Sequence, residues 1–225
     1  EMAFWIDGTA AMLHAWYPGE NGCQAIAEIL FGKINPSGRL PITIERSWAD
    51  AAAYGNYIPA GASLYNEPDY TSQCRPTFDV NYAEGIFVGH RHFDRNGQTP
   101  LFPFGFGLSY TTFAYSALRV KPNGAGGADV TFRVRNTGTR AGAEVAQVYV
   151  GDVQASVPRP VKELKGFARL VLNPGQEQET TVTLDRRAFA FFDVAKQDWV
   201  VEAGEFRILV GSSSQTMQLE GKLVI

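Results

Sequence analysis

The sequence lacks the features that define several protein classes. Only two of its 225 residues are cysteines, Cys23 and Cys74, and there is no C-x-x-C motif, so no disulfide framework is indicated. Their spacing leaves a single bridge open, and two separate thiols are the preferred interpretation. No apolar run approaches the length needed to span a bilayer. With 20 Lys and Arg against 23 Asp and Glu, we expect no nucleic-acid and no membrane partner.

What is present is the composition of an ordinary globular protein, with 45% hydrophobic and 19% charged residues. A length of 225 residues suits one large domain or two small ones. The pattern changes near Thr112. Before it, helix, turn and loop signals alternate, and after it short strands follow one another. We therefore expect an α/β part followed by an all-β part.

The first thirty residues predict a strand and a helix. The apolar run Ala10–Trp16 is typical of a strand, and Pro18-Gly19 ends it. A helix follows, with Asn21 as its N-cap. Its apolar face consists of residues at helical spacing: Ala25, Ile26, Ile29 and Leu30. Gly32 stands just past the helix end, where a left-handed backbone favours a residue without Cβ.

A turn and an edge strand are predicted next. Asn35-Pro36-Ser37-Gly38 matches a type I turn, and Leu40–Ile44 alternates like a strand that Pro41 confines to a sheet edge. A strand, a crossover helix and a strand belong in a sheet that helices cover on both faces. One helix and two short strands cannot do this. Residues 1 to about 50 therefore need further strands that the sequence does not contain.

Several motifs resemble one known family. PGENG, AIAEILFG and NPSGRLP, within residues 18–41, resemble the end of the α/β sandwich domain of glycoside hydrolase family 3, the β-glucosidase family. EGIFVGHRHFD (84–94) and PLFPFGFGLSYTTFAYS (100–116) are similar to the connector of that family. The region that follows resembles its fibronectin type III-like domain. The sequence departs from the family pattern at Cys23, where Gly is usual, and at His90, where Tyr is usual.

The fold class is thus predicted as an α/β fragment, the end of an α/β sandwich domain, followed by an immunoglobulin-like, fibronectin type III-like β-sandwich. The predicted divisions are residues 1–53, a long loop and connector at 54–112, and the β-sandwich at 113–225. Val130, Phe132 and Val134 should face its core, and Glu144–Val150 should be buried on both sides. The candidate strands are Ala114–Val120, Ala128–Asn136, Glu144–Val150, Val161–Leu172, Glu177–Leu184, Phe189–Asp193, Trp199–Ala203, Glu205–Gly211 and Gln218–Ile225.

Residues 45–82 form a long segment without periodicity that is rich in tyrosine. Such segments are uncommon in compact domains unless they are functional loops, linkers or arms. The preferred interpretation is an arm packed on domains outside this sequence, because tyrosine rings stabilise such packing. The sharper hypothesis places Tyr65 and Tyr70 beside a sugar cleft, where they would bind substrate by stacking on a ring.

Aromatic residues suggest two further contacts. Phe102, Phe104 and Phe106 alternate and predict a ridge at a domain junction. Trp199 could be a sugar platform or could cap the sandwich core, and the core role is preferred.

Residues 86–93 read as a strand, which would place His90, His92 and Asp94 on one side. That spacing could seat a metal, but no fourth ligand accompanies it. We therefore expect polar packing between domains, no metal and no cofactor.

The resemblance implies a retaining glycosidase. Its nucleophile is an Asp in the barrel domain and its acid/base is a Glu in the sandwich domain, both ahead of residue 1, so no catalytic residue is expected here. The carboxylates Glu20 and Glu28 are interpreted as structural, and Glu84 as half of an interdomain ion pair.

The function expected from the resemblance is that of the C-terminal portion of an exo-acting β-glucosidase, which cleaves terminal non-reducing β-D-glucosyl residues from oligosaccharides or glucosides. Its partners would be the upstream barrel and sandwich domains, and the fragment alone would be inactive. A periplasmic or secreted location is implied. Glucose or xylose specificity, linkage and a homodimer stay open. The alternative is a non-catalytic carbohydrate-binding or scaffolding β-sandwich module.

Overall fold

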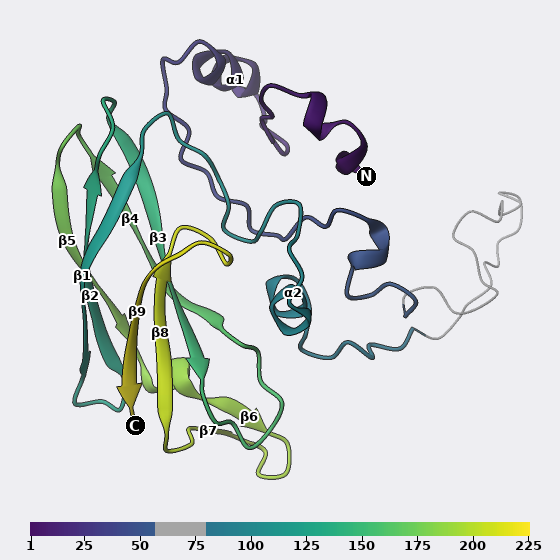
Figure 1. The fold of residues 1–225 in the computed structure, drawn as a ribbon, viewed down its shortest axis with the longest axis vertical. Coiled ribbons are helices and arrows are strands. Elements are labelled where there is room, and N and C mark those ends of the chain that lie inside the picture. The colour runs from purple at the N-terminus through teal and green to yellow at the C-terminus, as the bar shows by residue number, and fades with distance from the viewer. Residues whose placement is uncertain (57–79) are drawn as a thin grey trace, which may run out of the picture.

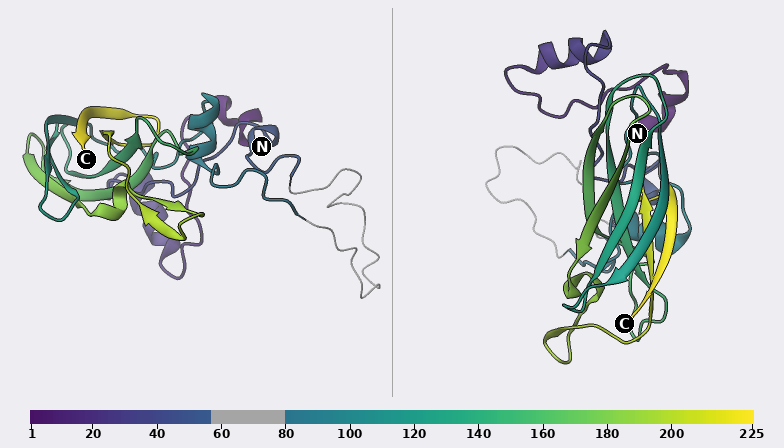
Figure 2. Two further views of the ribbon diagram at one scale, coloured as in Figure 1. Left: turned by 90° about the horizontal axis from the view of Figure 1, so that it is seen from below. Right: turned by 90° about the vertical axis from the view of Figure 1, so that its left-hand side faces the viewer.

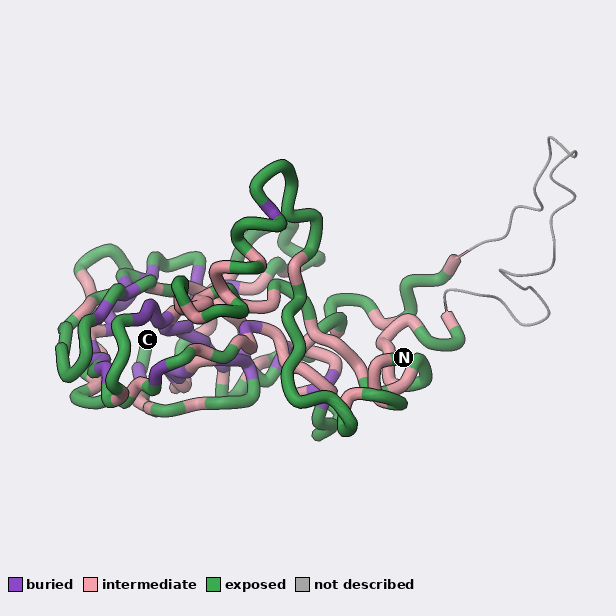
Figure 3. The backbone as a smooth tube through the Cα atoms, turned by 90° about the horizontal axis from the view of Figure 1, so that it is seen from above, coloured by how far each residue is buried: buried purple, intermediate pink, exposed green. Residues whose placement is uncertain are grey.

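The computed structural model describes residues 1–56 and 80–225. An irregular N-terminal part with short helices lies along one side and one end of a β-sandwich (Figures 1 and 2). Buried residues concentrate in the sandwich, whereas the N-terminal part is mostly exposed or half-buried (Figure 3). None of the helices in the described ranges is long and apolar enough to cross a membrane.

The helix α1, Gly22–Leu30, forms where the sequence predicts it. Asn21 is its N-cap residue, although its side chain makes no capping hydrogen bond. Gly32 has a positive φ of 72°, as the predicted helix end requires. The apolar face is only half covered, and Leu30 stays exposed. The chain therefore forms this helix without burying it.

Three predictions for the N-terminal part are wrong. Ala10–Trp16 is not a strand, because a strand needs a hydrogen-bonded neighbour and the segment has none among the described residues. Residues 35–38 form no turn, because the Asn35 side chain bonds to distant backbone instead of closing one. The expected strand Leu40–Ile44 is reduced to a single bridge between Ile44 and Phe102.

The segment that reads as a strand at 86–93 instead contains a helix, α2, at His90–Asn96. Gly89 precedes it at φ 55° and Gly97 follows it at φ 62°, both backbone states that suit glycine. Alternation of apolar and polar residues is too short here to decide between strand and helix. The remaining short helical turns are η1 (Met2–Phe4), η2 (Ile6–Gly8), η3 (Trp48–Asp50) and η4 (Arg186–Phe189).

All nine predicted strands form in the described residues, and three of them have the predicted ends. They are β1 Phe113–Pro122, β2 Ala128–Asn136, β3 Gly142–Asp152, β4 Glu163–Leu172, β5 Glu177–Leu184, β6 Phe191–Asp193, β7 Asp198–Val200, β8 Glu205–Gly211 and β9 Met217–Val224. One sheet has the order β1-β2-β5 and the other β4-β3-β8-β9, with antiparallel neighbours throughout. The strands β6 and β7 form a separate two-stranded hairpin.

The core lies between the two sheets. Val130, Phe132 and Val134 of β2 are fully buried in it, as predicted, opposite Val148 of β3 and Ile208 of β8. Alternation of apolar residues on each strand builds this interior, since successive side chains point to opposite faces of a sheet. The sandwich therefore has a hydrophobic core of its own.

The strand β3 is buried on both faces, as predicted. Its inner face joins the core through Ala146, Val148 and Val150. Its outer face holds Gln147 and Tyr149, which are buried even though no third sheet covers them. Residues of the N-terminal part supply that cover, and the contacts are described below.

Replacing Phe132 with Ala should lower the free energy of unfolding by about 3–5 kcal/mol, because the ring is 0% exposed and its removal leaves a cavity. Phe167 of β4 is 66% exposed, so Phe167→Ala should change it by no more than about 0.5 kcal/mol. Chemical denaturation followed by far-ultraviolet circular dichroism measures both. Equal losses for the two variants would contradict this packing.

Candidate functional site at the sandwich junction

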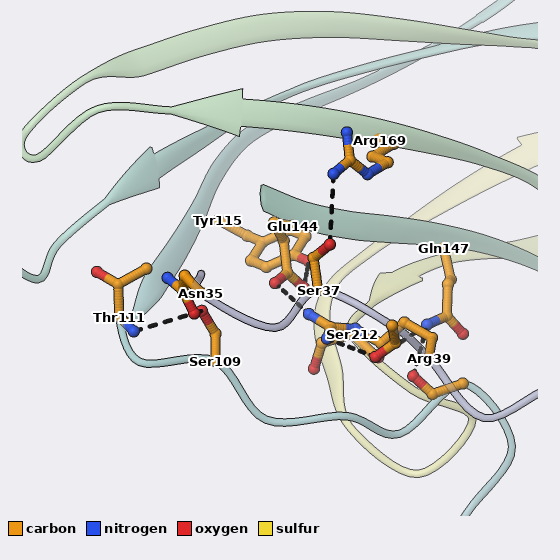
Figure 4. Close-up of polar contacts among 12 residues, drawn as sticks. Asn35, Ser37, Arg39, Ser109, Thr111, Tyr115, Glu144, Gln147, Arg169 and Ser212 are labelled. Atoms are coloured by element: carbon orange, nitrogen blue, oxygen red, sulfur yellow. Dashed lines mark hydrogen bonds and ion pairs between the residues drawn. The ribbon is translucent and has the colours of Figure 1, made fainter. Parts of the chain in front are cut away.

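Long-range polar contacts among the described residues gather where residues 35–44 and 89–111 cover the outer face of β3 and the adjoining end of the sandwich. We call this surface the junction. Figure 4 shows its central polar contacts, in which Arg39 bonds to Glu144 of β3 and Asn35 lies beside Ser109 of the connector. Because both parts of the chain meet here, the junction decides how they are placed relative to one another.

A buried ion pair lies at the inner edge of the junction. Glu144 is two residues from Ala146 and pairs with Leu170 of β4, so its side chain lies on the inner face of β3, toward Tyr115 of β1. The Arg39 guanidinium donates from Nη2 to Glu144 Oε2 at 2.6 Å, and the two side chains are only 8% and 4% exposed. The Tyr115 hydroxyl donates to the other carboxylate oxygen, Oε1, at 2.7 Å. Burial raises the pKa of Glu144, while the Arg39 charge and the bonds from Tyr115 and Arg39 act in the opposite direction. The partners are therefore what keeps a charged carboxylate tolerable here.

Asn35 fixes the chain entering the junction. Its Oδ1 accepts hydrogen bonds from Ser109 Oγ at 3.0 Å and from the Tyr110 backbone N–H at 2.8 Å. Its Nδ2 donates to the Ala141 carbonyl at 2.9 Å. The Tyr110 hydroxyl in turn donates to the Ile29 carbonyl at the end of α1, at 2.8 Å. One amide thus joins three segments, which explains why it does not start a local turn.

Gln147 joins the connector to the loop between β8 and β9. Its Nε2 donates to the Gly105 carbonyl at 3.1 Å and to the Ser212 carbonyl at 2.8 Å. Its Oε1 accepts from the Tyr149 hydroxyl at 2.6 Å. Gly105 has a φ of 80°, and a Cβ there would lie 2.1 Å from Gln147 Oε1, so the position requires glycine.

The aromatic ridge predicted at Phe102, Phe104 and Phe106 lies at this junction. The Phe102 and Phe106 rings are 5.5 Å apart, and Phe104 packs 5.1 Å from the His90 ring. His90 also meets Tyr149 edge-on at 6.0 Å. These rings cover the outer face of β3 and supply apolar contact around the polar bonds.

The helix α2 separates the residues that the sequence placed together as a candidate metal site. His90 and Asp94 lie one turn apart, and Asp94 Oδ1 pairs with Lys162 Nζ at 2.6 Å. His92 instead contacts the Asn96 amide and the edge of Phe93. No group of three or more His, Cys, Asp or Glu residues suited to a metal occurs in the part of the chain that the structure describes.

The other singled-out carboxylates have structural surroundings. Glu20 is exposed before α1 and does not cap it. Glu28 pairs with Lys33 at 2.5 Å, and the hydrogen bond from Lys33 is the main cause that lowers the pKa of Glu28. Glu84 accepts a bond from Asn56 at 3.2 Å, and the expected ion pair is not found within residues 1–56 and 80–225. None of these has the surroundings of a general acid.

Of the remaining candidate residues, the structure describes the surroundings of Cys23 and Trp199. Tyr65, Tyr70 and Cys74 lie outside the described residues, and Cys23 is exposed on α1 as a free thiol. The prediction that Trp199 caps the sandwich core is wrong. Its indole belongs to the β6–β7 hairpin, outside the core cluster, and is covered by the Arg187 guanidinium at 3.3 Å.

Comparison with known families identifies the family in which this arrangement occurs. Residues 1–110 match the model of the glycosyl hydrolase family 3 C-terminal domain, and residues 144–214 match that of the fibronectin type III-like domain. The chain belongs to glycoside hydrolase family 3. The family 3 resemblance found in the motifs is thereby confirmed, as is the fold class.

Individual relatives agree with the family. Thermostable β-glucosidase B of Acetivibrio thermocellus is 42% identical over 96% of this chain. The crystal structure of a β-glucosidase of Bifidobacterium adolescentis matches with a TM-score of 0.83 at 38% identity over 94% of the chain. β-Glucosidase 3B of Thermotoga neapolitana, solved in complex with glucose, matches with a TM-score of 0.84 at 37% identity over 98% of the chain. The chain spans only 27%, 29% and 29% of these three proteins.

Sequence reasoning missed Arg39, Glu144 and Gln147 as junction residues. Glu144 and Gln147 stand in a strand that was predicted to be buried on both sides, and a buried polar side chain needs a partner. That signal predicts that a partner exists but does not identify the partner residue. Arg39 is 105 residues away from Glu144, and no spacing rule connects them.

Replacing Arg39 with Ala should lower the free energy of unfolding by about 3–5 kcal/mol, because Glu144 would stay buried without its cation. Arg207→Ala is the matched control, since Arg207 pairs with Glu220 at the exposed surface and its loss should change the same quantity by less than about 1 kcal/mol. Urea denaturation measures both. Similar small losses would show that the junction pair contributes little.

Stability should fall as the pH drops below about 6.5, the ordinary pKa of histidine. Burial lowers the pKa of His90, which faces Asp94, Glu163, Arg91, Lys162 and the Tyr149 ring. Below this pH, His90 binds a proton in the unfolded chain more readily than in the folded chain, so acid favours unfolding. His90→Phe should flatten this dependence of the urea midpoint between pH 5 and 8.

Phe132→Ala serves as the control for that measurement, because it destabilises the core while leaving His90 in place. It should keep the wild-type pH dependence at a lower midpoint. If His90→Phe and Phe132→Ala showed the same pH dependence, His90 would not be its source.

Proposed function

We propose that the chain is the C-terminal part of a retaining, exo-acting β-glucosidase that releases terminal non-reducing β-D-glucosyl residues from oligosaccharides or glucosides. The observation that supports this most directly is the two-sided character of the N-terminal part. One side is fixed to the sandwich by the junction, and the other exposes apolar surface that a further layer of protein would cover. The relatives named above are β-glucosidases about four times as long.

The exposed side of the N-terminal part is rich in large apolar residues. They include Phe4 at 84%, Tyr17 at 98% and Phe31 at 89% exposure. A hollow of about 530 Å³ on this part is lined in part by apolar residues: Met2, Trp5, Ile42, Ile44 and Trp48. Contiguous apolar surface, such as the lining of this hollow, marks an interaction site in soluble proteins. We assign it to the remainder of the α/β sandwich domain of the same polypeptide.

In this proposal the chemistry comes from the remainder of the polypeptide. A retaining glycosidase needs a carboxylate nucleophile and a carboxylic acid on opposite sides of the scissile bond. Glu144 is a described carboxyl group whose pKa burial raises, which is the property of a general acid. However, both of its oxygens are engaged by Arg39 and Tyr115, so it has no place for a substrate. Its role is structural.

The sandwich then acts as a brace. It holds the connector by Gln147 and the segment after α1 by Glu144, and through Tyr110 of the connector it holds the end of α1. A free-standing carbohydrate-binding module would not need a connector on the outer face of β3. A periplasmic or secreted location belongs to the same proposal, and so do the barrel and sandwich domains as its partners.

Turnover of 4-nitrophenyl β-D-glucopyranoside tests the proposal. The full-length polypeptide that contains this chain should be active, and a version without residues 113–225 should lose at least about 100-fold of kcat/KM, since small misplacements of catalytic groups have effects of this size. The 225-residue chain alone should be inactive. Arg207→Ala in the full-length protein is the matched control and should keep full activity, because its ion pair with Glu220 is exposed.

Two results would contradict the proposal. Hydrolysis by the 225-residue chain alone would place the catalytic carboxyl groups within it. Inactivity of the full-length polypeptide on β-glucosides, with a folded spectrum, would remove the assigned reaction. Proton NMR of the first product tests the stereochemistry, because a retaining enzyme releases the β anomer before mutarotation.

A further inference from the structure

A groove of about 540 Å³ opens on the sandwich where the connector, the loop before β4 and the β6–β7 hairpin meet. Its lining includes Arg91, Pro158, Glu163, Arg187, Phe192 and Trp199. The hairpin lies at one end of the sandwich (Figure 1). This volume falls within the range of small-molecule sites. Of the junction residues 35–44 and 89–111, only Arg91 lines the groove, and the proposed catalytic reaction does not use it.

One wall of the groove is aromatic. The rings of Phe192 and Trp199 are 5.6 Å apart and inclined at 63° to each other. The Arg187 guanidinium lies over the indole with its Cζ 3.3 Å from the ring centroid. Stacking on the indole holds the guanidinium in place while its N–H groups stay available at the edge. The wall therefore combines an apolar surface with fixed hydrogen-bond donors.

The groove has an excess of positive charge, because Arg91, Arg159, Lys165 and Arg187 line it together with two carboxylates, Glu163 and Asp185. Glu163 is contacted by Arg91 at 3.0 Å, by Lys165 at 3.2 Å and by Arg159 at 3.8 Å. Arg159 is satisfied mainly by Asp152, at 2.8 Å. Arg187 has no carboxylate partner within the described residues. A guanidinium in that position favours a carboxylate, which it can bind through two parallel hydrogen bonds.

We propose that this groove binds a pyranoside that bears a carboxylate, such as a uronic acid unit, with the carboxylate on Arg187 and the ring against Phe192 and the part of the Trp199 indole that Arg187 leaves exposed. The choice of a sugar rests on the proposed function, whereas the anion site rests on charge complementarity alone. Glu163 and Lys165 line the same groove and present an acceptor and donors suited to ring hydroxyls. Because Arg91 comes from the connector, a bound ligand would touch both parts of the chain.

The experiment is a titration of the 225-residue chain followed by ¹H–¹⁵N NMR of the indole N–H groups. The probes are methyl β-D-glucuronide, methyl β-D-glucoside and sodium acetate at matched ionic strength. The glucuronide should shift the Trp199 signal and bind at least about 10-fold tighter than the other two, as expected for a charge-assisted pair. Trp16 is exposed away from the lining residues, so its signal should stay in place.

Variants locate the site. Arg187→Ala should weaken glucuronide binding about 10-fold and remove its advantage over the glucoside. Arg186→Ala is the matched control: it removes the neighbouring exposed arginine of η4, which does not line the groove, and should leave affinity unchanged. Trp199→Phe keeps an aromatic side chain in the hairpin and should weaken both sugars, with Phe192 amide shifts as the readout.

Four results would overturn the proposal. The first three are no shift with glucuronide, equal affinity for glucuronide and glucoside, and equal losses in the Arg186 and Arg187 variants. In the fourth, acetate would bind as tightly as glucuronide, and the groove would then be a simple anion site that does not recognise the sugar ring. None of these outcomes depends on hydrolysis of nitrophenyl glucoside, so a failure here and a failure of the proposed function are distinguishable.

Discussion

The placement of the N-terminal part against the sandwich depends on one buried carboxylate, which needs a cation and hydrogen-bond donors beside it. Glu144 stands in β3, where neighbouring side chains are apolar and water is excluded. An ionised carboxylate in such a place is strongly unfavourable unless cations and hydrogen-bond donors surround it. Sequence-local residues do not supply them. Arg39, from the segment after α1, and Tyr115, from β1, do so. The N-terminal part is therefore held in the one placement that satisfies this charge.

Apolar and polar contacts have different tasks at the junction. The Phe102, Phe104 and Phe106 rings remove apolar area from water, which favours association but tolerates sliding. The bonds of Asn35, Glu144 and Gln147 have directions and lengths that only one alignment satisfies. Gly105 adds a steric condition, because any side chain there would clash with Gln147.

Different elements of this fold were predictable to different degrees. The sandwich strands follow from local alternation and turn residues, so β2, β5 and β8 were found with their ends. The helix α2 was not, since a short run between two glycines fits either period. Ala10–Trp16 had the composition of a strand, but pairing is a property of two segments. The contacts of Arg39 and Asn35 are long-range for the same reason, and one sequence contains no signal that names their partners.

The junction also explains why a buried ion pair would be retained in the brace that we propose. Replacing such a pair by well-packed apolar residues is often neutral or stabilising, so the pair is a poor source of stability by itself. The pair instead makes every wrong placement of the N-terminal part unfavourable, because Glu144 would then lose Arg39 and stay buried. A brace for an active site needs that penalty more than it needs additional stability, because catalytic groups tolerate displacements of less than about 1 Å. An exposed pair such as Arg207–Glu220 could not provide it, since water would replace the lost partner.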